Sequence, residues 1–408
     1  MNKKHFFLST LVSITASIGL SACSSNQTFS GSQALDSIGS LFGETKSKVI
    51  PLEPLKPISN SINVKKVWQV NTGSANQITK IHPFITNKSI FVAGNYTASA
   101  WDKNSGKALW KTNIGEIISA GINSNSSNDQ IFIGTSNGNA ISLDASTGKV
   151  LWIERLNSEI LSISRAKDNR VVYRTIDGKL HGLTSNTGEI VWQQGQRTPA
   201  LSQYGAGVPL IIGNDPARSF VIAGFDNGKL ATYFLQNGQQ AWELAIAEPK
   251  GQSELDRMVD IDGKLSIMGT ALFATSLNGN NVGINLETGK IGWAKKFSSN
   301  NGISASPQGL YSSDTEGNIW KFQAQTGDPM WKMDDLVRRE PSTPIIVSPS
   351  LIIVGDKQGN IHWINSTNGQ FVARTQGDPA GFNVEPTVHG TSVYTLGKSG
   401  VLSKLLVQ

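Results

Sequence analysis

The chain has 408 residues, of which 38% are hydrophobic and 16% are charged, with 41 glycines, 10 tryptophans and one cysteine. This composition excludes a disordered or membrane-spanning chain and is typical of a large soluble body rich in β-strands. The formal net charge of +6 includes two lysines in a segment that we expect to be removed, and the remainder is too small over this length to indicate nucleic-acid binding.

The first 22 residues resemble the signal sequence of a bacterial lipoprotein. Lys3 and Lys4 form a positive start, and the apolar run 6–20 is too short and wrongly flanked for a spanning helix. Small residues then lead to Cys23, whose thiol would be acylated, as in palmitate attachment, once cleavage has made it the first residue. The alternative is an ordinary secretory signal with a chance cysteine. Ser24 follows, which in lipoproteins of enteric-type bacteria is typical of transport to the outer membrane.

A flexible tether is expected after the signal. Because Cys23 is the only cysteine, a disulfide within the chain is excluded, and acyl chains worth about 0.8 kcal/mol per CH₂ group would anchor the protein firmly. Residues 23–62 are rich in serine and glycine and then in proline, in PLEPLKPI (51–58), which favours extended polyproline II structure. A flexible chain of about 40 residues spans roughly 35 Å root-mean-square.

One motif recurs along the rest of the chain, beginning with WDKNSGKALW (101–110). The copies are SLDASTGKVLW (142–152), GLTSNTGEIVW (182–192), YFLQNGQQAW (233–242), INLETGKIGW (284–293), KFQAQTGDPMW (321–331) and a worn WINSTNGQFVA (363–373). Each intact copy has a glycine four residues before a tryptophan, in the pairs Gly106–Trp110, Gly148–Trp152, Gly188–Trp192, Gly238–Trp242, Gly289–Trp293 and Gly327–Trp331. In the worn copy, Gly369 precedes Ala373.

The period of this motif predicts the fold. The intervals from Trp68 to Ala373 are 42, 42, 40, 50, 51, 38 and 42 residues, and periods of about 40–50 residues are typical of propeller blades. Trp68 has no preceding turn, whereas the C-terminal GKSGVLSKLLVQ (397–408) resembles the strand before each turn, so we expect these two ends to share a blade. The predicted fold is all-β, an eight-bladed β-propeller of four-stranded antiparallel blades over residues 63–408, closed by pairing the N- and C-terminal strands.

The repeated residues have structural roles in this interpretation. The glycines supply the positive φ of a tight hairpin, and Asp102 and Asp144 are expected to accept turn amides. The regularly spaced tryptophans suit packing between neighbouring blades. Trp101, Trp320 and Trp363 lie off this series and are expected in the core, with positions at the rim or in contacts as the alternatives.

Quinoprotein dehydrogenases have similar repeats, so a redox enzyme is an alternative interpretation. Quinone chemistry in that family depends on calcium, an acidic base and often adjacent cysteines, and the single cysteine excludes a cysteine pair. The acidic segment VDIDG (259–263) lacks the further oxygen ligands of a calcium loop. No nucleotide-binding, nucleophile-elbow or zinc-protease motif occurs, and the histidines beyond the signal are scattered, as His82, His181, His362 and His389. The sequence therefore predicts no enzyme, metal or cofactor, and a ligand-binding propeller stays a further alternative.

The repeat interval is longer between Trp192 and Trp293, where two successive intervals each contain about eight extra residues. The extra residues fall in 195–210 and 244–260, on adjacent blades, so they could form one contact patch with Leu201 and Tyr204 as anchors. The second segment and its continuation add a predicted charged rim of Glu254, Asp256, Arg257, Asp260 and Asp262. The alternative is that both segments are long solvated loops.

Together these features resemble one family. The lipoprotein signal, the proline-rich tether, the stretch HPFITNKSIFVAGNYTASAWDKNSGKALW (82–110) and the eight worn repeats are similar to the BamB family, the lipoprotein subunits of the β-barrel assembly machinery of Gram-negative bacteria. The resemblance implies a non-enzymatic scaffold, lipid-anchored on the periplasmic side of the outer membrane, that assists assembly and insertion of outer-membrane β-barrel proteins. The implied partners are the periplasmic domains of BamA, other subunits of the machinery and unfolded outer-membrane proteins.

The family's partner-contacting loops can be carried over by position. One family loop has a Leu-Ser-Leu-Arg-Gly-like stretch, and this chain reads Leu201-Ser202-Gln203-Tyr204-Gly205 there, so the second leucine and the arginine are replaced. The other loop has an Asp-x-Asp pair, which Asp260 and Asp262 match. The predicted partner-binding residues are Leu201, Ser202, Gln203, Tyr204, Arg257, Asp260 and Asp262. We expect charge reversal at the two aspartates to weaken partner binding and leave the propeller folded.

Overall fold

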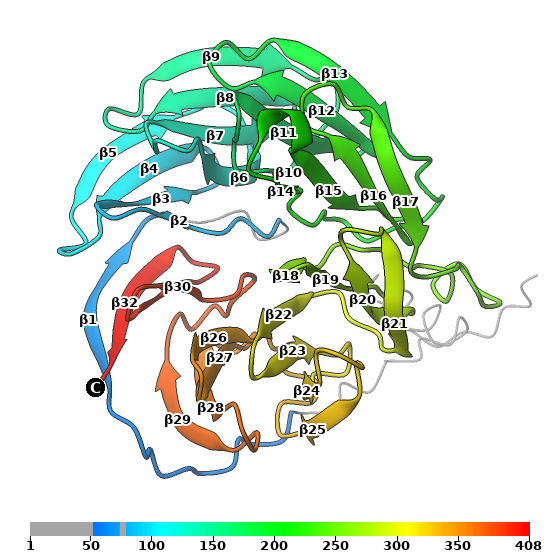
Figure 1. Cartoon of the computed structure of the whole chain (residues 1–408). Coiled ribbons are helices and arrows are strands. Elements are labelled where there is room, and N and C mark those ends of the chain that lie inside the picture. Colours follow the sequence, from blue (N-terminus) through cyan, green and yellow to red (C-terminus); the bar gives the residue numbers. More distant parts are fainter. Residues whose placement is uncertain (1–51, 74–78) are drawn as a thin grey trace, which may run out of the picture. The chain divides into compact units, whose positions relative to one another are not determined.

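The computed structural model describes residues 52–73 and 79–408, so the signal and Cys23 lie outside the described residues. In the described part, 32 strands form eight four-stranded antiparallel sheets that follow one another around a ring (Figure 1). The predicted eight-bladed all-β propeller is confirmed. The short helix in this part is a 3-10 turn, η2 (Pro216–Arg218), and no helix here has the length and apolarity to cross a bilayer.

Seven blades are built from consecutive strands, with the innermost strand first in the chain. The first two contain β2 (Phe84–Ile85), β3 (Ser89–Ala93), β4 (Thr97–Asp102), β5 (Ala108–Asn113), β6 (Ile118–Ser124), β7 (Gln130–Thr135), β8 (Asn139–Asp144) and β9 (Val150–Arg155). The third and fourth contain β10 (Ile160–Ile163), β11 (Arg170–Thr175), β12 (Lys179–Thr184), β13 (Ile190–Gly195), β14 (Leu210–Ile212), β15 (Phe220–Gly224), β16 (Lys229–Phe234) and β17 (Gln240–Ala245). The last three contain β18 (Ser266–Met268), β19 (Ala271–Thr275), β20 (Asn280–Asn285), β21 (Lys290–Lys296), β22 (Ile303–Ser306), β23 (Gly309–Ser313), β24 (Ile319–Phe322), β25 (Pro329–Met333), β26 (Ile345–Ser348), β27 (Leu351–Gly355), β28 (Asn360–Asn365) and β29 (Phe371–Gln376).

The eighth blade joins the two ends of the propeller. It contains β30 (Thr387–His389), β31 (Ser392–Leu396) and β32 (Val401–Val407), and β1 (Val64–Asn71) adds its outermost strand by antiparallel pairing with β32. Trp68 lies opposite Lys404 in this pair, and the Gln408 amide donates to the Asn63 carbonyl at 2.9 Å. The predicted pairing of the N- and C-terminal strands is confirmed.

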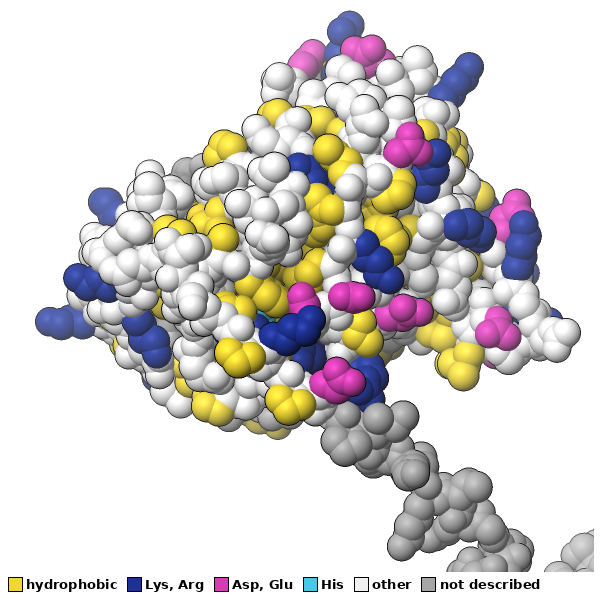
Figure 2. Space-filling model, turned by 90° about the horizontal axis from the view of Figure 1, so that it is seen from below, with side chains coloured by type: hydrophobic (Ala, Val, Ile, Leu, Met, Phe, Trp, Pro, Cys, Tyr) yellow, Lys and Arg dark blue, Asp and Glu magenta, His cyan; other side chains and the backbone are white. Residues whose placement is uncertain are grey.

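The two middle strands of a blade, such as β3, β4, β7 and β8, are buried on both faces because each sheet is stacked between two others. Strand β7 is buried at every position after its first, which is why its apolar run is continuous and does not alternate. The outer strand β13 alternates instead, with Trp192 buried and its neighbours exposed. Figure 2 shows one side of the molecule, on which basic and acidic side chains are interspersed with hydrophobic ones.

The tryptophans of the repeat pack between blades, as predicted. Trp152 on β9 lies against Gly188 in the outer turn of the next blade, and its indole N–H donates to the Ser185 carbonyl at 2.8 Å. A Cβ on Gly188, where φ is 79°, would lie 2.6 Å from the Trp152 ring, so the glycine is required both for the turn and for the contact. The same indole-to-carbonyl bond joins Trp110 to Ala145, Trp192 to Leu235, Trp293 to Ala324 and Trp331 to Ser366.

Two further predictions about the repeat are confirmed. The carboxylate of Asp102 accepts the amides of Asn104 and Ser105 at 3.2 and 2.7 Å, and Asp144 makes the equivalent turn. Of the tryptophans off the series, Trp101 and Trp363 are buried and Trp320 is partly buried.

The absence of a tryptophan at position 373, where the last copy of the repeat has Ala373, has a structural explanation. The blade that follows this copy is the eighth, in which β32 and β1 are not joined by a hairpin, so no turn glycine is present for a tryptophan to pack on. Part of the segment expected to be a tether lies along β29 instead (Figure 1). The Ser61 amide donates to the Val372 carbonyl at 2.7 Å, and Arg374 Nη1 donates to the Lys56 carbonyl at 2.9 Å.

Candidate functional site

Two long connections between neighbouring blades meet at one place. Loop A, residues 196–209, joins β13 to β14, and loop B, residues 246–265, joins β17 to β18. Together they contain most of the two insertions predicted from the repeat spacing. The Gln203 amide donates to Asp260 Oδ1 at 2.9 Å, and a Cβ on Gly207 would lie 3.0 Å from the Gly263 carbonyl. The structure therefore brings the two predicted segments into contact.

Loop A presents two large side chains to solvent. Leu201 is 40% exposed and Tyr204 is 43% exposed, while Ser202 and Gln203 are partly buried. The Tyr204 hydroxyl hydrogen-bonds the carboxylate of Glu159, which precedes β10. Burial and this contact raise the pKa of Tyr204. Loop A thus combines an aliphatic and an aromatic side chain with a backbone that is held by loop B.

Arg257 lies in an exposed turn of loop B. Its Nη1 is 3.1 Å from Glu254 Oε1, and its Nε donates to the Gly251 carbonyl at 3.2 Å. The Ser253 hydroxyl donates to the Asp256 carboxylate at 2.7 Å within the same turn. The predicted charged rim is therefore present at Glu254, Asp256 and Arg257.

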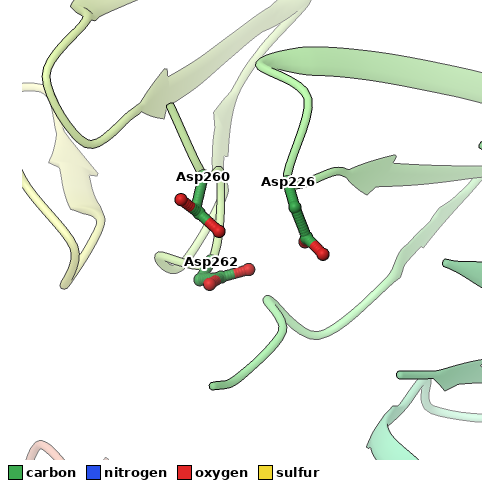
Figure 3. A group of neighbouring side chains, drawn as sticks. All are labelled: Asp226, Asp260 and Asp262. Carbon is green, nitrogen blue, oxygen red and sulfur yellow. The ribbon is translucent and has the colours of Figure 1, made fainter. Parts of the chain in front are cut away.

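Beneath the two loops, three carboxylates and one guanidinium share a buried space. Asp226 follows β15, Asp260 and Asp262 precede β18, and Arg174 comes from β11 in the neighbouring blade. One oxygen from each aspartate lies within 4.8 Å of the others, and Figure 3 shows the carboxylates directed toward a common space. Arg174 pairs with Asp226, donates to the Gly224 carbonyl at 2.5 Å and lies 3.8 Å from Asp262 Oδ1.

Burial dominates the electrostatics of this cluster. Asp260 is 1% exposed, and the Asp262 side chain is 7% exposed. Burial raises the pKa of Asp262 to about 8 and that of Asp260 to about 6, because a carboxylate is poorly solvated there and Asp226 adds like charge. The positive charge of Arg174 acts to lower the pKa of both Asp260 and Asp262, against the effect of burial.

The predicted charged rim is wrong for Asp260 and Asp262, which lie inside the protein because loop A covers them. Their role as partner-binding residues stays a prediction. Charge reversal there would place a second buried cation beside Arg174, so we now expect it to disturb loop B itself. Sequence reasoning missed Asp226 and Arg174. The available signal was the arginine within the apolar strand RVVYRT (170–175).

A cavity of about 650 Å³ lies between the innermost strands of the ring and contains Asp262 in its wall. Lys80, His82, Lys264 and Glu385 also line it. His82 Nε2 is 2.7 Å from Glu385 Oε2, and although burial acts to raise the pKa of Glu385, this pairing lowers it to about 2. The Lys80 ammonium donates to the Asn300 carbonyl at 3.1 Å. The histidines remain distributed over separate blades, as the sequence predicted.

The fold and the inter-blade contacts define the class of protein, an eight-bladed β-propeller built from PQQ-type tryptophan repeats. Residues 94–333 match the family model described as outer membrane protein assembly factor BamB. The chain is 31% identical to BamB of Shewanella oneidensis, over 86% of this chain and 91% of the relative. It is 28% identical to BamB of Yersinia pestis, over 91% of this chain and 96% of the relative. The chain belongs to the BamB family of outer membrane protein assembly factors.

Solved structures agree with this assignment. BamB from Moraxella catarrhalis superposes with a TM-score of 0.77 at 25% identity, covering 84% of this chain and 100% of that chain. Quinohemoprotein alcohol dehydrogenase from Comamonas testosteroni has a TM-score of 0.65 at 11% identity, a likeness that shows the fold alone. Because the relatives are assembly factors, the prediction of a non-enzymatic protein associated with the outer membrane is confirmed.

Proposed function

We propose that the chain is a scaffold lipoprotein that binds the periplasmic domains of BamA through loops A and B and so assists insertion of outer-membrane β-barrel proteins. Membership in the assembly-factor family supports this role. In this proposal, acylation of Cys23 after removal of residues 1–22 anchors the protein on the periplasmic side of the outer membrane. Residues 23–62 then connect the anchor to the propeller of residues 63–408.

The observation that carries the proposal is the paired geometry of the loops. Leu201 and Tyr204 are exposed on a short segment whose backbone is fixed by the bond between the Gln203 amide and Asp260. Exposed aliphatic and aromatic side chains on a preorganised backbone are the usual anchors of a protein interface, because little conformational entropy is lost on binding. Asp260 and Asp262 would then affect partner binding indirectly, by holding loop A in the position that exposes Leu201 and Tyr204.

The test is co-purification of BamA with the variant Leu201→Asp/Tyr204→Ser from detergent-solubilised outer membranes. Both side chains are exposed, and the hydrogen bond from Tyr204 to Glu159 that the variant loses lies at the surface, so the variant should unfold within a few degrees of the wild type. We expect recovered BamA to fall at least about tenfold, since removing two anchors commonly costs more than about 1.4 kcal/mol.

The control is Leu109→Asp, which repeats the leucine-to-aspartate part of the change at a 53% exposed leucine on β5, the outer strand of the first blade. This control should recover BamA at the wild-type level. Wild-type recovery by the loop A variant would show that BamA binds elsewhere.

A further inference from the structure

The cluster beneath loops A and B contains buried oxygens that the protein leaves unsatisfied. Neither oxygen of Asp262 accepts a hydrogen bond in the described residues, and Oδ2 of Asp260 also lacks a donor. Buried carboxylate oxygens are normally hydrogen-bonded or paired, because moving them out of water without a partner is unfavourable.

The neighbouring arginine does not supply the missing interactions. Arg174 Nη1 and Nη2 are engaged by the Gly224 carbonyl and by Asp226, and the guanidinium lies over the Phe225 ring at 5.2 Å. Its buried Nε makes no hydrogen bond to Asp262 or to any other group of the described residues. The distance of 3.8 Å from Arg174 Nη1 to Asp262 Oδ1 is too long for a hydrogen bond. With all three aspartates ionised, Arg174 leaves an excess of two negative charges. The Lys80 ammonium, which acts on Asp262 from the cavity wall, offsets only one of them.

We propose that Asp226, Asp260 and Asp262 form a binding site for one Ca²⁺ ion. The donors are all carboxylate oxygens, which suit a hard divalent cation and not Zn²⁺. Oxygens within 4.8 Å of one another can share a Ca²⁺ ion, whose ligands lie at about 2.3–2.6 Å. The positive charge of the ion would also offset the negative charge that Arg174 and Lys80 leave unbalanced.

The cavity at the centre of the ring provides access to the site. Asp262 stands in its wall, so an ion can enter from the cavity and water can complete the coordination there. Ca²⁺ tolerates such mixed and irregular coordination, whereas Mg²⁺ demands near-ideal octahedral geometry.

The site also connects to loop A. Asp260 offers one oxygen to the Gln203 amide, while the other faces the cluster unpaired. An ion bound by Asp260 and Asp262 would therefore hold loop B against the segment that carries Leu201 and Tyr204. This consequence rests on the proposed function, whereas the ion site itself does not.

The experiment uses the full mature protein in detergent, stripped with EDTA. Equilibrium dialysis with radioactive calcium should give one bound ion per chain, and the Tm should be higher in Ca²⁺ than in EDTA, because an ion that binds only the folded state stabilises it. Mg²⁺ at the same concentration should give a smaller increase in Tm.

The variant Asp262→Asn removes one ligand and should weaken Ca²⁺ binding by at least about tenfold. In EDTA its Tm should equal or exceed that of the wild type, because the neutral amide brings no charge into the buried space. The matched control is Glu254→Gln, which removes an exposed carboxylate from loop B and should bind Ca²⁺ like the wild type.

Several outcomes would overturn the site. If the wild type binds no Ca²⁺ and its Tm is the same in Ca²⁺ and EDTA, the cluster is balanced by protonation. If Asp262→Asn still binds one ion at wild-type affinity, the ion lies elsewhere. Should Asp262→Asn fail to fold, wild-type crystals soaked in Sr²⁺ decide the matter, through the presence or absence of anomalous density among the three aspartates. If Ca²⁺ binds as proposed but BamA recovery is the same in EDTA, only the link to the proposed function fails.

Discussion

At the scale of single residues, burial changes the pKa of ionisable side chains in this propeller. His181 on β12 is 2% exposed, and its Nε2 lies 3.2 Å from the Thr175 hydroxyl. Burial lowers the pKa of His181 from the ordinary 6.5 to about 4, because the imidazolium form cannot be solvated there. The folded protein therefore keeps this histidine neutral at pH 7.

This shift predicts a specific acid sensitivity. Between pH 6.5 and about 4, His181 binds a proton in the unfolded chain but not in the folded one, so the free energy of unfolding falls as the pH falls through this range. The contribution of His181 is about 3 kcal/mol over the full range. His181→Gln should abolish this contribution, which urea unfolding at pH 7.5, 6, 5 and 4 would measure. If the free energy of unfolding changes with pH in the same way for both proteins, the acid sensitivity does not come from His181.

At the scale of elements, neighbouring blades are joined by an outer-strand tryptophan and a turn glycine. Trp192 on β13 packs against Gly238, and a Cβ at Gly238 would lie 2.6 Å from the ring, at a backbone φ of 71°. The indole N–H also donates to the Leu235 carbonyl at 2.8 Å. The repeated glycine and tryptophan therefore form contacts between blades: the tryptophan of one copy packs against the turn glycine of the next copy.

A double-mutant cycle tests this coupling. Trp192→Ala alone should cost about 3–5 kcal/mol of unfolding free energy. Gly238→Ala alone should cost roughly 1–2 kcal/mol for the left-handed backbone and a further ~1–3 kcal/mol for the clash with the ring. In the Trp192→Ala background only the backbone part should remain, as measured by urea unfolding.

The control for the backbone part is Gly115→Ala, since Gly115 has φ of 79° but no atom within 4 Å of its Cβ position. Its cost should match that of Gly238→Ala in the Trp192→Ala background. An equal cost of Gly238→Ala with and without Trp192 would exclude the inter-blade contact as the cause.

At the scale of the whole molecule, the ring is held shut by one strand pair from opposite ends of the described chain. Strand β32 lies between β31 and β1, so it is the element through which the first described strand reaches the rest of the eighth blade. Because one blade contains strands from both ends, the ring has no terminal blade with an unpacked face, which limits fraying and association.

Deletion of residues 401–408 should therefore affect the entire propeller. We expect β1 and β31 to lose their partner, and the protein to lose its cooperative thermal transition and elute as aggregates on gel filtration. Deletion of residues 52–61 is the control, because it uncovers the edge of β29 but leaves the ring closed. This control should unfold cooperatively at a lower Tm. A cooperative, monomeric 401–408 deletion would show that closure is dispensable.

The repeat could be interpreted from sequence because its determinants are local. A tight turn needs glycine at a set position, and a docking tryptophan recurs once per blade, so period and glycine–tryptophan spacing predicted the number of blades and the closure by β1 and β32. The same periodicity located loops A and B, because insertions that lengthen the period must fall between blades. Leu201 and Tyr204 could be selected as exposed anchors since loop residues are mostly at the surface.

The sequence by itself thus determined the class of fold, the family and the position of the two long loops. Only the tertiary structure decided that Asp260 and Asp262 are buried, because burial depends on loop A folding over loop B. It alone brought Arg174 and Asp226 to them, since Arg174 lies on β11, Asp226 follows β15, and both are more than 30 positions away along the chain. The raised pKa values of Asp260 and Asp262 arise because segments distant in the sequence bring charged groups into one buried space. Short-range sequence patterns do not show which distant segments come into contact.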